Sequence, residues 1–316
     1  TGTIGSIIVK YLLQLQTHFH VLIGGRRSIK EISMSTFYNS ERLKYNQMNY
    51  NNDVELDNFC SQCLLVINAV GPSFKINDKI ALHALRNNCH YIDIGGYGIL
   101  RDLLKPYEKS IEAQKLCFII GVGWMPGISG VFSKTIIETH LNSPENTNFN
   151  IYYGAVDNWS YSSTYDLAAS SMGKTRSYVY SHGKEIQVSP FRYTHHKFFP
   201  FIGHKKICMP SFDEQLTQLA TSLKQIRKIS TFIMLNDYIS MGKFMFIKIF
   251  YKHNLNKATL MLQDDYQRLV KKENKWGSVI CQVSKIEPER KIDTFYYLYT
   301  KNNLLYTCLL YTSDAA

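Results

Sequence analysis

The sequence predicts an α/β fold, in which a doubly wound parallel sheet is followed by a second α+β domain with a mixed or antiparallel sheet. Strand-like and helical segments alternate through residues 1–143 at the spacing of βαβ units. From residue 144 onward strand-like segments dominate, which favours antiparallel or mixed pairing. A glycine-bearing loop at residues 1–5, TGTIG, runs directly into an amphipathic helix. Such a loop is typical of the phosphate-binding turn of a dinucleotide-binding unit.

Hydrophobic periodicity places the elements of the first domain. Apolar residues spaced three and four apart between Ile4 and Leu15 predict the first helix. Buried strands are predicted at 20–25, 64–70, 90–96 and 117–123, with a weaker strand at 43–49. Helices are predicted between and after them, at 54–63, 78–88, 99–114 and 128–141. This order predicts a parallel sheet with helices on both faces.

A boundary between the two domains is predicted at residues 142–148, NSPENTN, which are polar and contain a proline. Beyond it the pattern predicts a helix at 211–226 and strands at 149–156, 177–188, 244–253, 257–263 and 278–286. We therefore predict a nucleotide-binding domain at 1–143 and a substrate domain at 144–307.

The two ends of the chain are expected to depart from those of a complete protein. No strand precedes the loop at residues 1–5, so we expect the first strand and the first glycine of the motif to be missing. Residues 308–316, CLLYTSDAA, correspond to the translation of a common transposon sequencing adapter, and we expect a non-native tail there. The chain is thus interpreted as a fragment.

Composition excludes several classes of protein. The 316 residues are 45% hydrophobic and 19% charged, so the chain can bury the cores of about two domains. The net charge of +11 comes from scattered Lys and Arg without a basic stripe, and we expect no nucleic-acid partner. No apolar run approaches the ~20 residues of a membrane span and no signal peptide is visible, so we expect a cytoplasmic protein without a membrane partner.

Cysteine and histidine patterns predict no metal site. The 7 cysteines are unevenly spaced, which favours reduced thiols. Cys60 and Cys63 form the only CxxC, in a helix-like segment where burial is the simpler interpretation. His195 and His196 are neighbours on a strand-like segment, so their side chains are expected on opposite faces.

Candidate cofactor-binding residues fall at the predicted carboxyl ends of the strands, where open α/β sheets bind ligands. At the first loop, backbone amides can approach a pyrophosphate near the positive end of a helix, and the residues concerned are Gly2, Thr3, Ile4 and Gly5. Taken alone, this motif is also typical of an ordinary turn that enters a helix.

The second strand ends in GGRR rather than in an acidic residue, about twenty residues after the first loop. A carboxylate there would accept hydrogen bonds from the ribose of NAD. Arg26 or Arg27, which follow Gly25, can instead pair with the 2′-phosphate of NADP. The alternative is two solvated surface arginines. We predict NADP as the cofactor in preference to NAD.

Two further strand ends supply candidates for the nicotinamide end of the cofactor. Small residues and a rigid proline would let the ribose and nicotinamide lie against the backbone at Asn68, Ala69, Val70, Gly71 and Pro72. Asp93, in HYIDIGG, supplies a carboxylate at the edge of the crevice. Asp93 and Tyr91 are the candidate catalytic residues. A helix cap or a structural acceptor is the alternative for Asp93.

Together, TGTIG, LIGGRR, VINAVGP, HYIDIGG and GVGWMPGISG resemble, in order and spacing, the saccharopine dehydrogenase-like oxidoreductases. The resemblance covers residues 1 to about 140 and is loose beyond them. It implies a Rossmann domain with an inserted substrate domain, the pyrophosphate at residues 2–5, the 2′-phosphate at Arg26 and the nicotinamide ribose at residues 68–72. The resemblance also implies that Tyr91 and Asp93 face the same crevice. The candidate substrate-contacting residues there are Trp124, Met125, Pro126 and Gly127.

The resemblance also implies an enzyme. Members reduce imines formed from amino acids or polyamine precursors, and some relatives reduce carbon–carbon double bonds of lipid intermediates. We therefore predict NADP-dependent hydride transfer to or from a small amino-acid-derived imine or secondary amine. An enoyl reductase and a non-catalytic dinucleotide-binding sensor or scaffold are the alternatives, since a fold does not determine function. The sequence leaves open whether the chain forms a homodimer.

Overall fold

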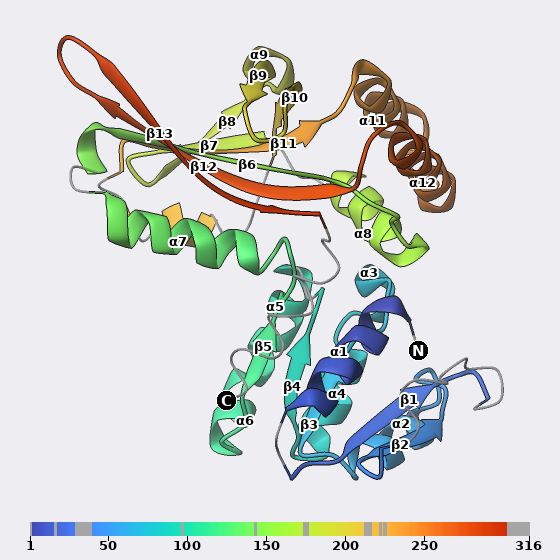
Figure 1. Cartoon of the computed structure of the whole chain (residues 1–316). Coiled ribbons are helices and arrows are strands. Elements are labelled where there is room, and N and C mark those ends of the chain that lie inside the picture. Colours follow the sequence, from blue (N-terminus) through green and yellow to red (C-terminus); the bar gives the residue numbers. More distant parts are fainter. Residues whose placement is uncertain are drawn as a thin grey trace. The chain divides into compact units, whose positions relative to one another are not determined.

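The computed structural model describes residues 2–15, 18–28, 40–95, 98–141, 144–172, 177–211, 217–220, 223 and 226–301. The tail predicted at 308–316 and most of the helix predicted at 211–226 lie outside these residues. Contacts within the chain divide it into two compact units (Figure 1). We call Thr1–Trp124 unit 1 and Met125–Asn303 unit 2.

Unit 1 is built on parallel strands that form two separate ladders in the described residues. β1 (Val21–Gly25) pairs with β2 (Leu43–Gln47), and a second ladder has the order β3 (Leu65–Asn68), β4 (His90–Asp93), β5 (Phe118–Ile120). The helices are α1 (Thr3–Gln14), α2 (Asp53–Cys60), α3 (Ser73–Ile76), α4 (Lys79–Arg86), α5 (Gly98–Leu104) and α6 (Glu108–Ala113). The predicted parallel α/β architecture is confirmed.

One helix, α1, packs against both ladders. Val9 lies in an apolar cluster with Ile23 of β1, while Ile8 lies in another with Ile67 of β3 and Ile92 of β4. In the described residues no backbone ladder joins β1 to β3, so side-chain burial under α1 connects the two halves. α2, α4 and α5 contribute to a separate apolar core that also includes residues of β3 and β4. The sheet therefore has helices on both faces, as doubly wound folds do.

Unit 2 is built on a mixed sheet with the order β13-β12-β6-β11-β10-β9, to which β7 and β8 are added through β11. β6 runs parallel to β11, and the other neighbours are antiparallel. The strands are β6 (Thr147–Val156), β7 (Ser177–Ser181), β8 (Lys184–Val188), β9 (His195–Phe199), β10 (His204–Pro210), β11 (Lys228–Leu235), β12 (Trp276–Ile286) and β13 (Lys291–Thr300). The predicted α+β unit with a mixed sheet is confirmed.

This sheet curls until the outer strands in its order approach each other. Phe201, just after β9, stacks on Tyr297 of β13 with ring centroids 4.1 Å apart. Lys197 of β9 donates a hydrogen bond to Gln282 of β12 at 2.6 Å. On the sheet, α8 (Tyr161–Met172) packs in one apolar cluster with α11 (Tyr238–Phe250) and α12 (Leu255–Lys272). No helix in the described residues is long and apolar enough to cross a bilayer.

Two predicted strands are wrong, because residues 244–253 fall largely in α11 and residues 257–263 fall in α12. Side chains cap both helices: Asp237 accepts from the amide of Ser240 at 2.9 Å, and Asn254 accepts from that of Lys257 at 3.1 Å. Apolar residues occupy both the buried and the exposed sides of α11, and this arrangement hides the helical period in the sequence.

α7 (Ile128–His140) packs with unit 2, although the sequence places it in the first domain. Ser133 Oγ lies 3.6 Å from Cys281 Sγ of β12, and the ring of His140 stacks on Tyr296 of β13 with centroids 4.6 Å apart. Figure 1 shows the helix running along one face of the sheet. Contacts thus divide the chain after Trp124, and a functional boundary at residue 143 stays a prediction.

Candidate functional site

The N-terminus of α1 meets the loop that follows β3. A Cβ placed on Gly5 would lie 3.7 Å from the Cβ of Ala69, so the first turn of α1 touches this loop. Gly2 is exposed and has open space where a side chain would stand, and no side chain caps the helix. An uncapped helix N-terminus beside open space fits a phosphate group. The side chain of Thr3 lies outside the described ones.

Asp93 ends β4 with its carboxylate held by several donors. Its Oδ2 accepts hydrogen bonds from Asn68 Nδ2 at 2.7 Å and from the Tyr91 hydroxyl at 2.5 Å, and its Oδ1 accepts one from the amide of Gly95 at 2.8 Å. Asp93 is only 3% exposed. The parallel register makes Asn68 and Asp93 partners across β3 and β4, which brings the two side chains together. The donors offset the cost of burying a charged carboxylate.

The same network shapes the loop after β3. Asn68 Oδ1 accepts a hydrogen bond from the amide of Val70 at 3.0 Å, and the Gly71–Pro72 peptide is cis. Gly95, after β4, lies against Ser73 at the start of α3, since a Cβ on Gly95 would stand 1.9 Å from Ser73 Oγ. No side chain fits there, so the loops after β3 and β4 are packed tightly together.

A pocket opens beside this network. Asn68 and Asp93 form part of its polar lining, and residues of α3, α5 and the turn between α3 and α4 complete it: Ser73, Phe74, Ile76, Asn77, Ile99 and Leu100. The pocket has room for about one water molecule, so it marks a polar recess beside Asp93 and is too small for a substrate. The α3 residues are not among those predicted from the sequence, although they follow Pro72 directly and extend the strand-end motif by one turn.

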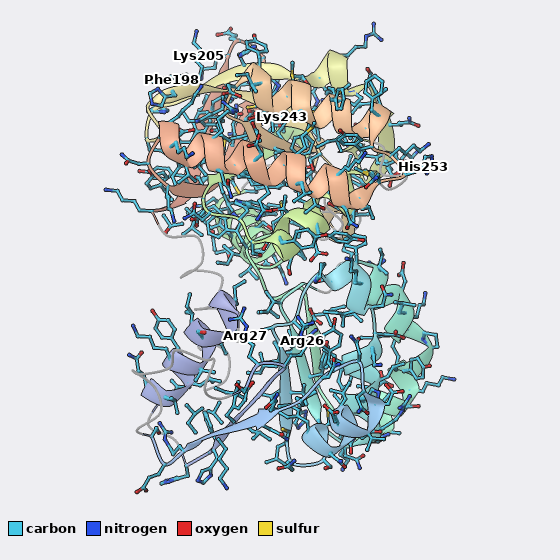
Figure 2. All side chains as sticks on the ribbon, turned by 90° about the vertical axis from the view of Figure 1, so that its right-hand side faces the viewer. Arg26, Arg27, Phe198, Lys205, Lys243 and His253 are labelled. Atoms are coloured by element: carbon cyan, nitrogen blue, oxygen red, sulfur yellow. The ribbon has the colours of Figure 1, made fainter. Side chains whose placement is uncertain are left out.

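Arg26 and Arg27 follow β1 directly, and both are exposed (Figure 2). In the described part of the chain neither arginine has a carboxylate partner. Gly25, which ends β1, precedes them. Two guanidinium groups without acidic partners fit a phosphate ligand, for which bidentate hydrogen bonding is favourable.

The predicted substrate-contacting residues fall at the connection between the units. Trp124 ends unit 1 and Met125 begins unit 2. The Met125–Pro126 peptide is cis, and Gly127 has a φ of 129°, a conformation that favours glycine, immediately before α7. Their contact with substrate stays a prediction.

The CxxC cysteines are protonated thiols in apolar surroundings. Burial raises the pKa of Cys60 to about 12 and that of Cys63 to about 11. Cys89 contacts both, since its Sγ lies 3.2 Å from the Cys60 carbonyl oxygen and 3.0 Å from that of Cys63. Thiols with raised pKa are poor nucleophiles and poor metal ligands. Across the described residues, no three His, Cys, Asp or Glu side chains gather as a metal site would require.

Comparison with solved structures gives one match that shows the same fold, a saccharopine dehydrogenase, and two weaker alignments. Saccharopine dehydrogenase (L-Glu forming) from Saccharomyces cerevisiae, in its apo form, aligns with a TM-score of 0.65 and 13% identity, over 99% of this chain and 88% of that chain. An engineered D-amino acid dehydrogenase bound to NADP+ aligns with a TM-score of 0.49 and 9% identity, over 98% and 83%. The C. glutamicum DAP dehydrogenase in complex with DAP aligns with a TM-score of 0.48 and 10% identity, over 98% and 83%. No curated protein matches the chain in sequence.

Parallel strands that carry an uncapped helix N-terminus and an arginine pair at their carboxyl ends define a Rossmann-type dinucleotide-binding protein. Residues 1–117 match the family described as the saccharopine dehydrogenase NADP binding domain. The chain therefore carries an NADP-binding domain of the saccharopine dehydrogenase type at residues 1–117, and it is an NADP-dependent oxidoreductase with a small-molecule substrate. The predicted resemblance, enzyme class and cofactor are confirmed.

Proposed function

We propose that the chain transfers a hydride between NADP(H) and a small amino-acid-derived imine or secondary amine. The observation that carries this proposal is the buried Asp93 carboxylate, held beside the loop of residues 68–72. The match of residues 1–117 to an NADP-binding domain supports the cofactor, and the fold shared with a yeast saccharopine dehydrogenase supports the type of reaction.

The binding roles follow the strand ends. The first turn of α1 is proposed to hold the pyrophosphate through backbone amides, with Arg26 and Arg27 on the adenosine 2′-phosphate. The loop after β3 is proposed to hold the nicotinamide ribose, through Asn68, Ala69, Val70, Gly71 and Pro72. NADPH supplies the hydride when it is bound, and the protein residues orient it against the acceptor.

Asp93 gives a reason to prefer an imine over an enoyl acceptor. Its carboxylate is buried, so its charge acts through little water and is weakly screened. A nearby carboxylate raises the pKa of a bound imine nitrogen and so favours the protonated form that accepts hydride, whereas an enoyl thioester has no basic nitrogen to protonate. Tyr91 donates to the same carboxylate at 2.5 Å and is proposed to keep it oriented or to relay a proton.

The experiment compares Asp93→Asn with the matched control Asp102→Asn in the full chain. Asp102 is an exposed carboxylate of α5 that pairs with its neighbour Arg101. In Asp93→Asn, kcat for imine reduction should fall by ~10²-fold or more while the Kd for NADPH changes by less than about threefold. Asp102→Asn should leave both unchanged. Circular dichroism checks that the Asp93→Asn variant is folded.

Three outcomes separate the alternatives. Equal activity of Asp93→Asn and the wild type removes the proposed role of Asp93. Turnover of enoyl thioesters but of no imine overturns the substrate class and keeps hydride transfer. NADPH binding without any NADPH oxidation, across imines and enoyl thioesters, supports a non-catalytic sensor.

A further inference from the structure

The two arginines that follow β1 have their main chain held by side chains of the neighbouring strand. The hydroxyl of Tyr45 donates a hydrogen bond to the carbonyl oxygen of Arg27 at 2.5 Å. Gln47 Nε2 donates one to the carbonyl oxygen of Arg26 at 3.3 Å. Tyr45 and Gln47 are two apart on β2 and therefore share a face of that strand. Both bonds use the arginine backbone and leave the guanidinium groups for other partners.

The glycine pair before the arginines makes room for this arrangement. A Cβ on Gly25 would stand 2.8 Å from the Tyr45 hydroxyl oxygen, so a side chain there would displace the hydroxyl from Arg27. A Cβ on Gly24 would stand 2.9 Å from Met48 Sδ and 3.0 Å from the Phe59 ring. The amide of Met48 also donates to the carbonyl of Gly25 at 2.8 Å. The turn from β1 into the arginine segment is thus held against β2 and α2.

Holding the backbone of the arginine segment favours binding of an anion. Arg26 and Arg27 are adjacent cations without acidic partners in the described residues, so their charges repel each other in the absence of an anion. If the segment were free, an anion would have to order its backbone as well as its side chains on binding. A pre-ordered backbone lowers this entropic cost, and affinity rises accordingly.

We propose that Tyr45 and Gln47 are positioning residues for recognition of the adenosine 2′-phosphate. The proposal rests on the assignment of Arg26 and Arg27 to that phosphate under the proposed function. It also gives Gly25 a specific role: this glycine admits the tyrosine hydroxyl that fixes the arginine segment. These residues touch neither substrate nor the reacting atoms, and they act through the arginines.

The test measures binding of adenosine 2′,5′-bisphosphate and of AMP to the full chain by titration calorimetry. AMP lacks the 2′-phosphate, so the ratio of the two Kd values isolates recognition of that group. Tyr45→Phe keeps the ring against Gly25 and removes only the donor. Gln47→Ala removes the second donor. Tyr161→Phe is the matched control, because its hydroxyl donates to Asn256 in unit 2.

Tyr45→Phe should weaken the bisphosphate by about three- to tenfold and leave AMP unchanged, and Gln47→Ala should act in the same direction with a smaller effect. Tyr161→Phe should change neither ligand. A merely structural role of Tyr45 would weaken both ligands together or lower the melting temperature without changing their ratio, and either result overturns the proposal.

The arginine variants keep the two levels of inference apart. If Arg26→Ala and Arg27→Ala each lower the preference for the bisphosphate but Tyr45→Phe and Gln47→Ala do not, the positioning role fails and the phosphate assignment stands. If neither arginine variant changes the preference, the assignment itself fails, and the positioning role fails with it.

Discussion

The strands of the two units are held together in different ways. In unit 2 the backbone carries the connection: β6 and β13 have 10 residues each and β12 has 11, and all three belong to one ladder. In unit 1 the strands have 3 to 5 residues and belong to two ladders in the described part of the chain. A long ladder holds its strands by many hydrogen bonds, whereas two short ladders depend on what packs across them.

The same difference separates stability from ligand binding. The candidate cofactor site is made of loops at the ends of the short strands of unit 1, where Asp93, Asn68 and the arginine pair lie. Unit 2 contributes hydrogen-bonded strands and capped helices. Changes in unit 1 should therefore affect binding and local stability together.

The largest effect is expected from removing the apolar contact of α1. Ile8 is 3% exposed and packs against β3 and β4, so Ile8→Asp would bury an unpaired charge and cost about 3 to 5 kcal/mol of the free energy of unfolding of unit 1. Hydrogen exchange followed by mass spectrometry should show loss of protection in β1 to β5, with β6 and β12 protected as before.

Ile249→Asp is the control for this change, because Ile249 is 66% exposed on α11 and the substitution should shift stability by less than about 0.5 kcal/mol. Equal loss of protection in both units would mean that they unfold together, and the contrast between them would disappear.

A smaller effect is expected at the packed loops of the site. In Gly95→Ala the new methyl group would meet Ser73 Oγ and the Ser73 Cβ, so the loops after β3 and β4 must move apart. We expect a loss of about 1 to 3 kcal/mol, measured by urea unfolding. Ser73→Gly in the same chain should recover part of it by removing the clash. No recovery in the double variant would show that the two loops are not in direct conflict.

The smallest effect is expected from a charge pair in unit 2. Arg268 holds Asp237 by two hydrogen bonds, at 2.6 Å and 2.9 Å, and keeps the pKa of that carboxyl well below its usual range. A lowered pKa stabilises the fold above the ordinary carboxyl value, and this contribution is lost as the pH falls toward the folded-state value. Asp237→Asn keeps the helix cap and removes the charge.

Thermal melts at pH 7 and pH 3 check this prediction. The wild type should be more stable than Asp237→Asn at pH 7, and the gap should narrow at pH 3. Asp264→Asn is the control, because Asp264 is 77% exposed and its pair with Lys243 is screened by water. A gap that is constant with pH would show that the ionised Asp237 contributes no net stability.

Much of the architecture was predictable, because the spacing of hydrophobic residues along the sequence indicates which residues are buried. The face from Ile4 to Leu15 forms α1, and the apolar runs ending in Gly25, Asn68 and Asp93 form β1, β3 and β4. α11 escaped the same reasoning, because a helix with apolar residues on all sides has no visible period.

The candidate site was predictable only as a set of positions. Asp93 and Asn68 stood out as polar residues at strand ends, but their hydrogen bond depends on a register between β3 and β4 that no local pattern encodes. Tyr45 and Gln47 were missed for the same reason. Their respective partners Arg27 and Arg26 lie 18 and 21 residues away along the chain and meet them only through the pairing of β1 with β2.

The glycine pair at the end of β1 has a consequence for how such sequences diverge. Met48 and Phe59 of the apolar core occupy the space that a side chain at Gly24 would need, whereas at Gly25 that space is taken by the Tyr45 hydroxyl, which serves the arginine segment. A descendant that lost its nucleotide would stay under selection to keep Gly24, while Gly25, Arg26 and Arg27 could drift. The first glycine is therefore tied to packing within unit 1, and the second glycine is tied, with the arginines, to the ligand.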